Sequence, residues 1–257
     1  MRISHPVFNE KAPFPTFCEL PSPDNGSSLR FLVDTNGATE SIWQLRPQPS
    51  RFLQLNKTRP LSLRESLCAN DVKVLKDKRL LALTMGYALM QSHGSPFIKD
   101  VLEKDSVFLL KSMEMRLDFS RLFVATKFPR LNASPEPLNI TLQHRCAPIL
   151  NLGILLLEVH FERLLETQYE MILTADERAN QSPNTKLVVA ERLVDRLEPW
   201  VSNHYRDAII ACLKIPWVPA GIAVDLSDSD ISAGFYDHVV KPLETDVDLY
   251  RRPMQII

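Results

Sequence analysis

The segment CAPILNLGILLLEVHFERLLE, from Cys146 to Glu166, decides the fold of this chain. Its residues 149–157 are apolar on every side of a helix, apart from Asn151 and Gly153. This run is too short to span a bilayer, which needs about 20 apolar residues, and a helix that is apolar all round lies inside the fold. Pro148 suits the first helical turn, while Gly153 lets another backbone or a bulky ring come close. The sequence therefore predicts one buried central helix with the other elements packed around it.

Composition and charge limit the class of protein. Thirty basic residues face thirty-one acidic ones among 257, so the formal charge is −1 and nothing favours nucleic acid as a partner. With 45% hydrophobic residues the chain can bury a sizeable core. Its four cysteines are scattered, which favours reduced thiols inside a cell, and its first residues lack the apolar stretch of a signal peptide. We expect a cytoplasmic protein, with the nucleus as the alternative compartment, and no membrane span.

Short strands are predicted ahead of the central helix. Residues 1–28 hold five prolines and are predicted to form an irregular arm. Residues 29–60 are predicted to form a small β-containing cap, with Asn36-Gly37 as a turn between its first two strands. The strands of this cap are predicted over 29–33, 41–45 and 51–55. Two more strands are predicted over 107–110 and 122–125.

Helices are predicted over most of residues 61–245, which we expect to form the main domain. Ser62 and Glu65 have the spacing of a capping box, which predicts a short helix over 61–67. Apolar residues at helical spacing predict a long helix over 78–92, and the basic cluster Lys76–Arg79 is interpreted as a solvated helix face. After the central helix, further helices are predicted over 182–198, 203–215 and 227–241.

Two polar segments are predicted to lack stable structure. Residues 174–186 have almost no apolar content and are predicted to be mobile. Pro242 is interpreted as the end of the last helix. Residues 246–257 are predicted to be a fraying tail.

The order of these segments resembles the C-lobe of a protein kinase. ILNLGILLLEVHF (149–161) looks like its central helix, commonly written D-V-x-S-x-G-x-x-L-x-E. The segments that look like its neighbouring helices are 61–67, 81–93 and 205–213. This resemblance implies a mainly α (α+β) fold, with a kinase-like C-lobe around a buried central helix and a reduced β-containing N-terminal cap.

The chain is more closely similar to a fungal family of unknown function. That family often follows HeLo-type or prion-inhibition-and-propagation domains. The segments that carry the similarity are LALTMGYALMQSHGSPFI (81–98), PILNLGILLLEVHF (148–161) and DLSDSDISAGFYDHVVKPLE (225–244). They span roughly residues 61 to 245.

Much of the apparatus of a kinase is missing from the sequence. Phosphoryl transfer needs a Gly-rich loop, a strand lysine paired with a helix glutamate, a catalytic Asp and metal ligands. Only about thirty residues lie between Leu29 and Pro60, too few for the five strands and helix that carry the first of these parts. Gly26 and Gly37 are the only glycines ahead of Gly86. No Gly-rich loop is present, and no lysine suits the strand position.

Three acids nevertheless keep the spacing of kinase catalytic residues. Asp100, Asp105 and Asp118 stand 5 and then 13 positions apart, and Asp118-Phe119-Ser120 looks like an altered D-F-G motif. The His-Arg ahead of the catalytic Asp is absent, and Pro148 replaces the Asp that would brace the catalytic loop. We interpret the three acids as vestiges and expect neither catalysis nor a cofactor. The alternative is an atypical nucleotide-binding protein, or a residual kinase-like phosphotransferase, that uses them with Mg²⁺.

Two short motifs could each begin a metal site. His144-x-Cys146 and His160-x-Glu162 hold potential ligands two positions apart. No second pair at ligand spacing follows either of them. We favour structural roles for these residues and expect no metal.

The leading hypothesis is a non-catalytic interaction or scaffolding domain inside fungal cells, with a protein partner that the sequence does not identify. The resemblance implies a link to HeLo-type signalling in self/non-self recognition or programmed cell death, in which an upstream helical domain is the effector. These 257 residues hold no such domain, so we expect a stand-alone relative or part of a longer gene product. Nothing in the sequence indicates the oligomeric state.

Overall fold

The computed structural model describes the greater part of the chain, namely residues 27–34, 41–49, 60–69, 71–92, 102–111, 117–124, 144–199 and 201–251. The chain divides into two compact units, Met1–Thr58 and Arg59–Ile257. The second unit, called the helical domain below, is mainly helical with a small antiparallel sheet.

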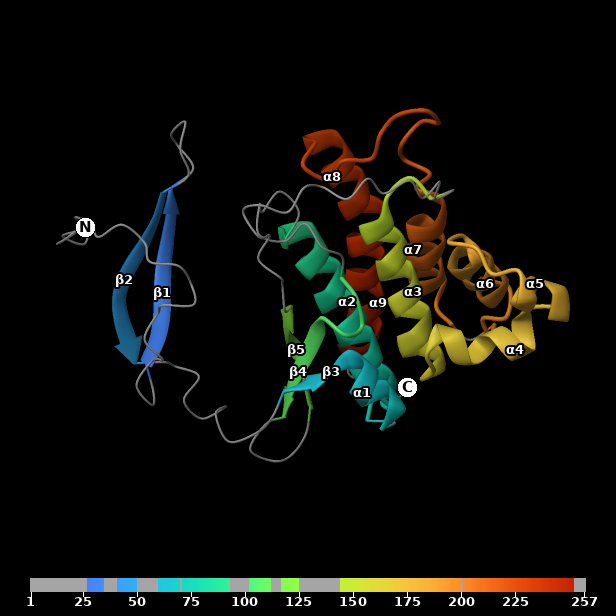
Figure 1. Ribbon diagram of the computed structural model, residues 1–257, viewed down its shortest axis with the longest axis horizontal. Helices are drawn as coiled ribbons and strands as arrows, with labels where there is room; N and C mark the ends of the chain where they lie inside the picture. Colours follow the sequence, from blue (N-terminus) through green and yellow to red (C-terminus); the bar gives the residue numbers. More distant parts are fainter. Residues whose placement is uncertain are drawn as a thin grey trace, which may run out of the picture. The chain divides into compact units, whose positions relative to one another are not determined.

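The first unit contains a two-stranded antiparallel ribbon. Strand β1 (Ser27–Asp34) pairs with strand β2 (Ser41–Pro49), and the register shifts between Ser28 and Arg30 (Figure 1). The predicted strands 29–33 and 41–45 lie within them. The predicted turn at Asn36-Gly37 and the predicted strand 51–55 lie outside the described residues.

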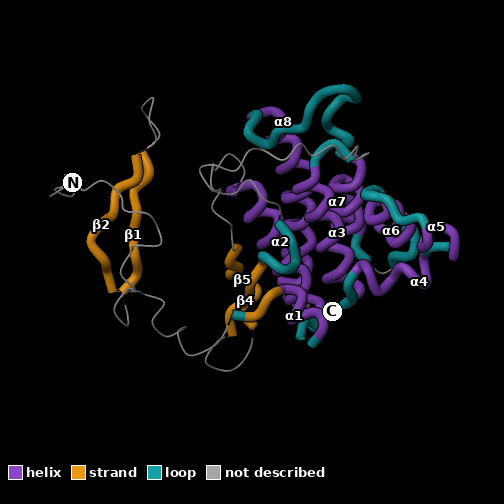
Figure 2. Tube along the Cα trace, in the orientation of Figure 1, coloured by secondary structure: helices purple, strands orange, loops and turns teal. Residues whose placement is uncertain are grey.

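The sheet of the helical domain has the strand order β3-β4-β5 and is antiparallel throughout. Its strands are β3 (Leu61–Ser62), β4 (Val107–Lys111) and β5 (Leu117–Val124). Val107 and Leu109 of β4 are fully buried against the helices. Figure 2 shows these strands at one edge of a domain made mostly of helices.

Helix α1 (Leu63–Cys68) follows β3 directly and begins at the predicted capping box. The Ser62 side chain accepts from the backbone N–H of Glu65, and the Glu65 carboxylate accepts from the backbone N–H of Ser62. Two backbone donors at the start of the helix are thereby satisfied. The helix starts two residues later than predicted, because residues 61 and 62 pair with β4.

Helix α2 (Leu75–Ser92) begins three residues ahead of the predicted start and corrects one expectation about charge. Lys76 is exposed, but Lys78 and Arg79 are buried, so the cluster is not a solvated face. Arg79 lies 3.0 Å from the carboxylate of Asp246 in helix α9. A partner from a distant segment is what allows such a charge to be buried.

Helix α3 (Ala147–Phe161) is the predicted central helix, and its burial is confirmed. Pro148 stands in its first turn, and Leu152, Leu156 and Leu157 are completely buried. Each such leucine contributes roughly 1.5–3 kcal/mol by burial. Helices α2, α6 and α7 pack around it. The last helical residue is Phe161, five residues before the end of the quoted segment, and Glu162 caps the helix in the left-handed conformation.

His144 and Arg145, just before the N-cap of α3, hold the C-terminal end of α7 (Asn203–Lys214). His144 Nε2 lies 2.9 Å from the carbonyl oxygen of Cys212, one of the carbonyls that a helix end leaves unpaired. The guanidinium of Arg145 donates to the three carbonyls of Ile215, Val218 and Pro219. Together, these hydrogen bonds of His144 and Arg145 hold the C-terminal end of α7 against the start of α3.

Short helices connect α3 to α7. They are η3 (Leu165–Gln168), α4 (Tyr169–Ile172), α5 (Ala175–Ala179) and α6 (Thr185–Val194). The segment 174–186, predicted to be mobile, contains α5 because Thr174 and Glu177 form a second capping box. No helix in the described part of the chain is both long and apolar enough to cross a membrane.

The last helices run further than predicted. Helix α8 (Ser229–Phe235) is capped by Asp228, and one π-helical turn, η4 (Tyr236–Val240), precedes α9 (Lys241–Arg251). The π turn runs directly into α9, so Pro242, which has no N–H to donate, stands just after the turn where the hydrogen-bond pattern changes. Pro242 therefore does not end the helix. Residues 246–251 of the predicted tail belong to α9.

Candidate functional site

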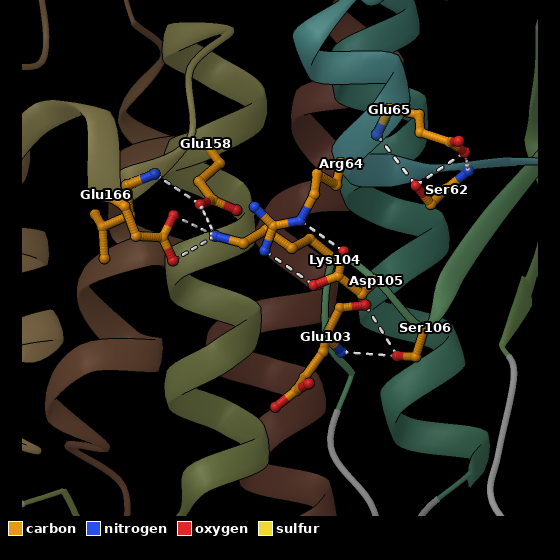
Figure 3. A network of polar contacts seen from close by, with 10 residues as sticks. Ser62, Arg64, Glu65, Glu103, Lys104, Asp105, Ser106, Glu158 and Glu166 are labelled. Carbon is orange, nitrogen blue, oxygen red and sulfur yellow. Dashed lines mark hydrogen bonds and ion pairs between the residues drawn. The ribbon is translucent and has the colours of Figure 1, made fainter.

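A small pocket lies between helix α3 and the turn that leads into β4 (Figure 3). Its volume is about 110 Å³. Charged groups from α1, from this turn, from α3 and from η3 meet at it, namely Arg64, Lys104, Asp105, Glu158 and Glu166. Its apolar lining consists of Leu102, Ile154, Leu155 and Leu165. Glu103, Asn151 and Lys186 complete it.

Lys104 links two glutamates across this pocket. Its ammonium donates to Glu158 Oε1 over 2.7 Å and to the two carboxylate oxygens of Glu166 over 2.8 and 2.6 Å (Figure 3). The Lys104 side chain is 11% exposed, so solvent screens these ion pairs only in part. One lysine thus ties the turn before β4 to α3 and to η3.

Glu158 is a buried carboxylate in the last turn of the apolar helix α3. Its side chain is 1% exposed, and its Oε1 also accepts from the backbone N–H of Leu165 over 2.7 Å. Burial raises the pKa of Glu158 above its usual value, although the hydrogen bonds from Leu165 and Lys104 act in the opposite direction. Among the described residues none donates to its second oxygen, Oε2. The carboxylate therefore keeps an unused acceptor.

Asp105, one of the three predicted vestigial acids, is engaged by Arg64. The guanidinium donates to both carboxylate oxygens, over 2.6 and 2.9 Å. This hydrogen bond lowers the pKa of Asp105 below its usual value. The bidentate pair joins α1 to the turn before β4. Asp105 is thus occupied by a structural partner.

The structure does not bring the predicted acids together. Asp100 lies outside the described residues. Asp105 stands two residues before Val107, which pairs with Val124 at the end of β5, whereas Asp118 lies at the start of β5. Asp118 stands six positions before Val124 along β5, which corresponds to about 20 Å. The carboxylates of Asp105 and Asp118 therefore cannot share one metal ion in this arrangement.

The residues of the two motifs His144-x-Cys146 and His160-x-Glu162 have structural partners. His144 contacts the backbone of Cys146 and of Cys212. His160 Nε2 lies 3.1 Å from a carboxylate oxygen of Glu198. Glu162 pairs with Lys78. Within the part of the chain that the structure describes, no three His, Cys, Asp or Glu residues come together in a way that could hold a metal ion.

Buried His144 should make the stability of the domain depend on pH. Its Nε2–H donates to the Cys212 carbonyl, and its Nδ1 accepts from the Cys146 N–H over 3.2 Å, so the neutral ring is satisfied and Nδ1 has no room for a proton. Burial lowers the pKa of His144 below its usual value near 6.5. The unfolded chain therefore binds a proton first as the pH falls below about 6.5, and the free energy of unfolding decreases.

The test compares urea denaturation of the wild type with His144→Gln at pH 7.5 and pH 5.5. As the pH falls from 7.5 to 5.5, the free energy of unfolding should decrease more steeply for the wild type than for His144→Gln. For this one proton the two slopes should differ by at most about 1.4 kcal/mol per pH unit. Only the difference in slope is compared, because other groups also titrate. Equal slopes would contradict a neutral, buried His144.

Of the residues that line the pocket, sequence reasoning singled out Asp105 alone. It gave no role to Glu158, which is buried. A signal existed, since Glu158 stands four positions after Ile154 and three after Leu155, on a face that is otherwise apolar. Lys104 gave no such signal, because its partner Glu158 lies 54 positions away in the sequence.

The fold and the pocket define a mainly helical domain whose charged groups are paired with one another around a small cavity. A family model described as Domain of unknown function (DUF7580) matches residues 21–250, and the chain belongs to this family. The match begins well ahead of residue 61, so it includes strands β1 and β2 as well as the helical domain. A comparison with curated proteins found no match.

Proposed function

We propose that this member of the DUF7580 family is a non-catalytic interaction or scaffolding domain whose helical part resembles a protein-kinase C-lobe. The buried helix α3, which follows the β4–β5 hairpin and packs against α2 and α7, supports that likeness. The similarity of residues 81–98 and 225–244 to a fungal family supports a role within fungal cells, in the cytoplasm, linked to HeLo-type self/non-self recognition or cell death.

The pairing of charges around the pocket carries the non-catalytic part of this proposal. Lys104 is shared by Glu158 and Glu166, and Asp105 is held by Arg64. A phosphoryl-transfer site instead needs carboxylates that are free to hold Mg²⁺ and a lysine that is free to hold phosphate. Each of these five charged groups already has an intramolecular partner of opposite charge.

The size of the pocket leads to the same proposal. Sites for small molecules and cofactors usually have volumes of roughly 300–1,000 Å³. The pocket beside α3 has about 110 Å³, which suits a single side chain. A nucleotide needs more room than this pocket provides.

A thermal-shift titration with ATP and Mg²⁺ tests the absence of nucleotide binding. A ligand at about 100 times its dissociation constant adds about 2.7 kcal/mol of stability. We expect no change in the melting temperature at millimolar nucleotide, for the wild type or for Asp118→Ala. An active protein kinase in the same buffer is the positive control. A shift in the wild type that Asp118→Ala abolishes would favour the nucleotide-binding alternative.

The interaction itself is tested by affinity capture from fungal lysate. The intact chain should retain the same protein reproducibly and in a saturable manner, and Asp118→Ala should retain as much of it as the wild type. Heat-unfolded protein on the same matrix is the control for nonspecific capture. If no protein is retained by the folded chain above this control, the interaction hypothesis fails.

A further inference from the structure

The pocket beside α3 has more negative than positive charge. Four carboxylates line it, those of Glu103, Asp105, Glu158 and Glu166. Three cations line it, those of Arg64, Lys104 and Lys186. The Arg64–Asp105 pair neutralises itself, Lys104 is shared by the two glutamates of α3 and η3, and Lys186 also acts on Glu166. The excess of negative charge in the pocket attracts a cationic ligand.

The most buried of these carboxylates has an unused acceptor. Oε1 of Glu158 receives Lys104 and the N–H of Leu165, while Oε2 receives no donor from the described residues. An unpaired acceptor that is shielded from water costs roughly 1–3 kcal/mol. A donor that reaches this carboxylate would recover that free energy. The ligand should therefore carry N–H groups.

The shape of the pocket suits a side chain that is apolar along its length and charged at its end. The apolar lining, formed by Leu102, Ile154, Leu155 and Leu165, can cover a methylene chain. The carboxylates of Glu158 and Glu166 both bind Lys104, so they lie within reach of one cation. A planar guanidinium can donate to two carboxylates at once, whereas an ammonium acts as a point charge.

We propose that this pocket receives an arginine side chain of a protein partner, whose guanidinium binds Glu158 and Glu166 in place of the Lys104 ammonium. This inference rests on the proposed function, because it names the chemistry by which the interaction domain would recognise its partner. Lys104 is the internal occupant of the site in the unbound protein. It competes with the ligand, so its removal should strengthen binding.

The binding experiment uses Nα-acetyl-arginine amide as the probe and follows backbone NMR shifts of the intact chain. The corresponding lysine and citrulline amides are the matched probes. Shifts should concentrate at the pocket, and the arginine probe should bind about tenfold more tightly than the lysine probe. The citrulline probe, which has the same shape and no charge, should not bind.

Three variants test the site itself. Glu158→Gln keeps the shape of the side chain and should weaken binding of the arginine probe about tenfold. Lys104→Met should strengthen it by a similar factor, since the competing cation is gone. Glu177→Gln, which changes a glutamate paired with Arg192 outside the pocket, is the control and should have no effect. Circular dichroism establishes that each variant is folded. If Lys104→Met does not fold, Glu166→Gln takes its place and should weaken binding.

The outcomes separate this inference from the proposed function. If the arginine probe shows no shifts at the pocket, or binds Glu158→Gln as tightly as the wild type, the arginine site is wrong. A partner captured equally by the wild type and by Glu158→Gln would leave the interaction function standing and would overturn the arginine site. Capture of no partner by the folded wild type would instead overturn the interaction function.

Discussion

The Arg79→Met variant is expected to lose roughly 3–5 kcal/mol of unfolding free energy, because it leaves Asp246 as a buried carboxylate without its cation. Arg79 is 2% exposed, and its Nε lies 3.0 Å from Asp246 Oδ2. Its guanidinium carbon also lies 3.6 Å from the centre of the Tyr205 ring, a cation–π contact that methionine cannot make. The pair therefore connects α2, α7 and α9, and its loss should affect the whole helical domain.

The surroundings of Asp246 add to this expected effect. Burial raises the pKa of Asp246, so the charged form depends on Arg79 and on the hydroxyl of Ser202, which donates to Oδ1. Ser202 also caps α7 by accepting from the backbone N–H of Tyr205. Removal of the cation thus leaves a buried charge beside a helix cap.

Urea denaturation of the intact chain, followed by circular dichroism, measures this effect. Lys76→Met is the matched control, since Lys76 is an exposed residue of the same helix, and its midpoint should stay close to that of the wild type. The double variant Arg79→Met/Asp246→Leu should recover most of the loss, because an apolar pair of similar volume needs no ion. If the single variant Arg79→Met has the same urea denaturation midpoint as the wild type, the buried Arg79–Asp246 ion pair does not stabilise the fold as we expect.

The Gly153→Leu variant is expected to cost about 1–3 kcal/mol by overpacking the contact between α3 and α7. A Cβ atom at position 153 would lie 2.9 Å from the Cβ of Cys212 and 3.2 Å from Leu213 Cδ2. Both neighbours are buried on α7, so they cannot move aside without shifting that helix. The sequence predicted that another backbone or a bulky ring comes close at Gly153, and the structure places Cys212 and Leu213 of α7 there.

Gly86 provides the matched control for this position. It also lies within a helix, but a Cβ there would meet Leu243 and Val240 at ordinary distances of 3.5 and 3.7 Å. Gly86→Ala should therefore be neutral or stabilising, by up to about 1 kcal/mol from helix propensity, whereas Gly153→Ala should destabilise. Relative to the wild type, the urea denaturation midpoint should stay unchanged or rise for Gly86→Ala and should fall for Gly153→Ala. Equal midpoints would contradict the packing of α3 against α7.

Features that depend on a few neighbouring residues could be predicted from the sequence. The capping box of Ser62 and Glu65 and the position of Pro148 in the first turn of α3 follow from chemistry within one helical turn. The helix predicted over 203–215 is α7, which begins and ends within one residue of that range. Pro242 was the exception, because the π turn before it changed where the last helix begins.

The pocket could not be predicted, because its contacts join distant segments. Lys104 and Glu166 lie 62 positions apart, and neither residue carries a local pattern that distinguishes it from a solvated one. The spacing of Asp105 and Asp118 suggested a shared site, but the antiparallel register of β4 and β5 places them at opposite ends of the hairpin. The number of positions between two residues predicts the distance between them only when both lie in the same helix or strand.

The sequence by itself determined that one helix, α3, lies at the centre of the fold. Residues 149–157 are apolar on every side, and no arrangement that exposed them to water would be stable. Only the tertiary structure decided which charges are buried, among them Arg79, Glu158 and Asp246. The reason is that a charge leaves water only when a partner of opposite charge reaches it, and that partner comes from a part of the chain that no local pattern specifies.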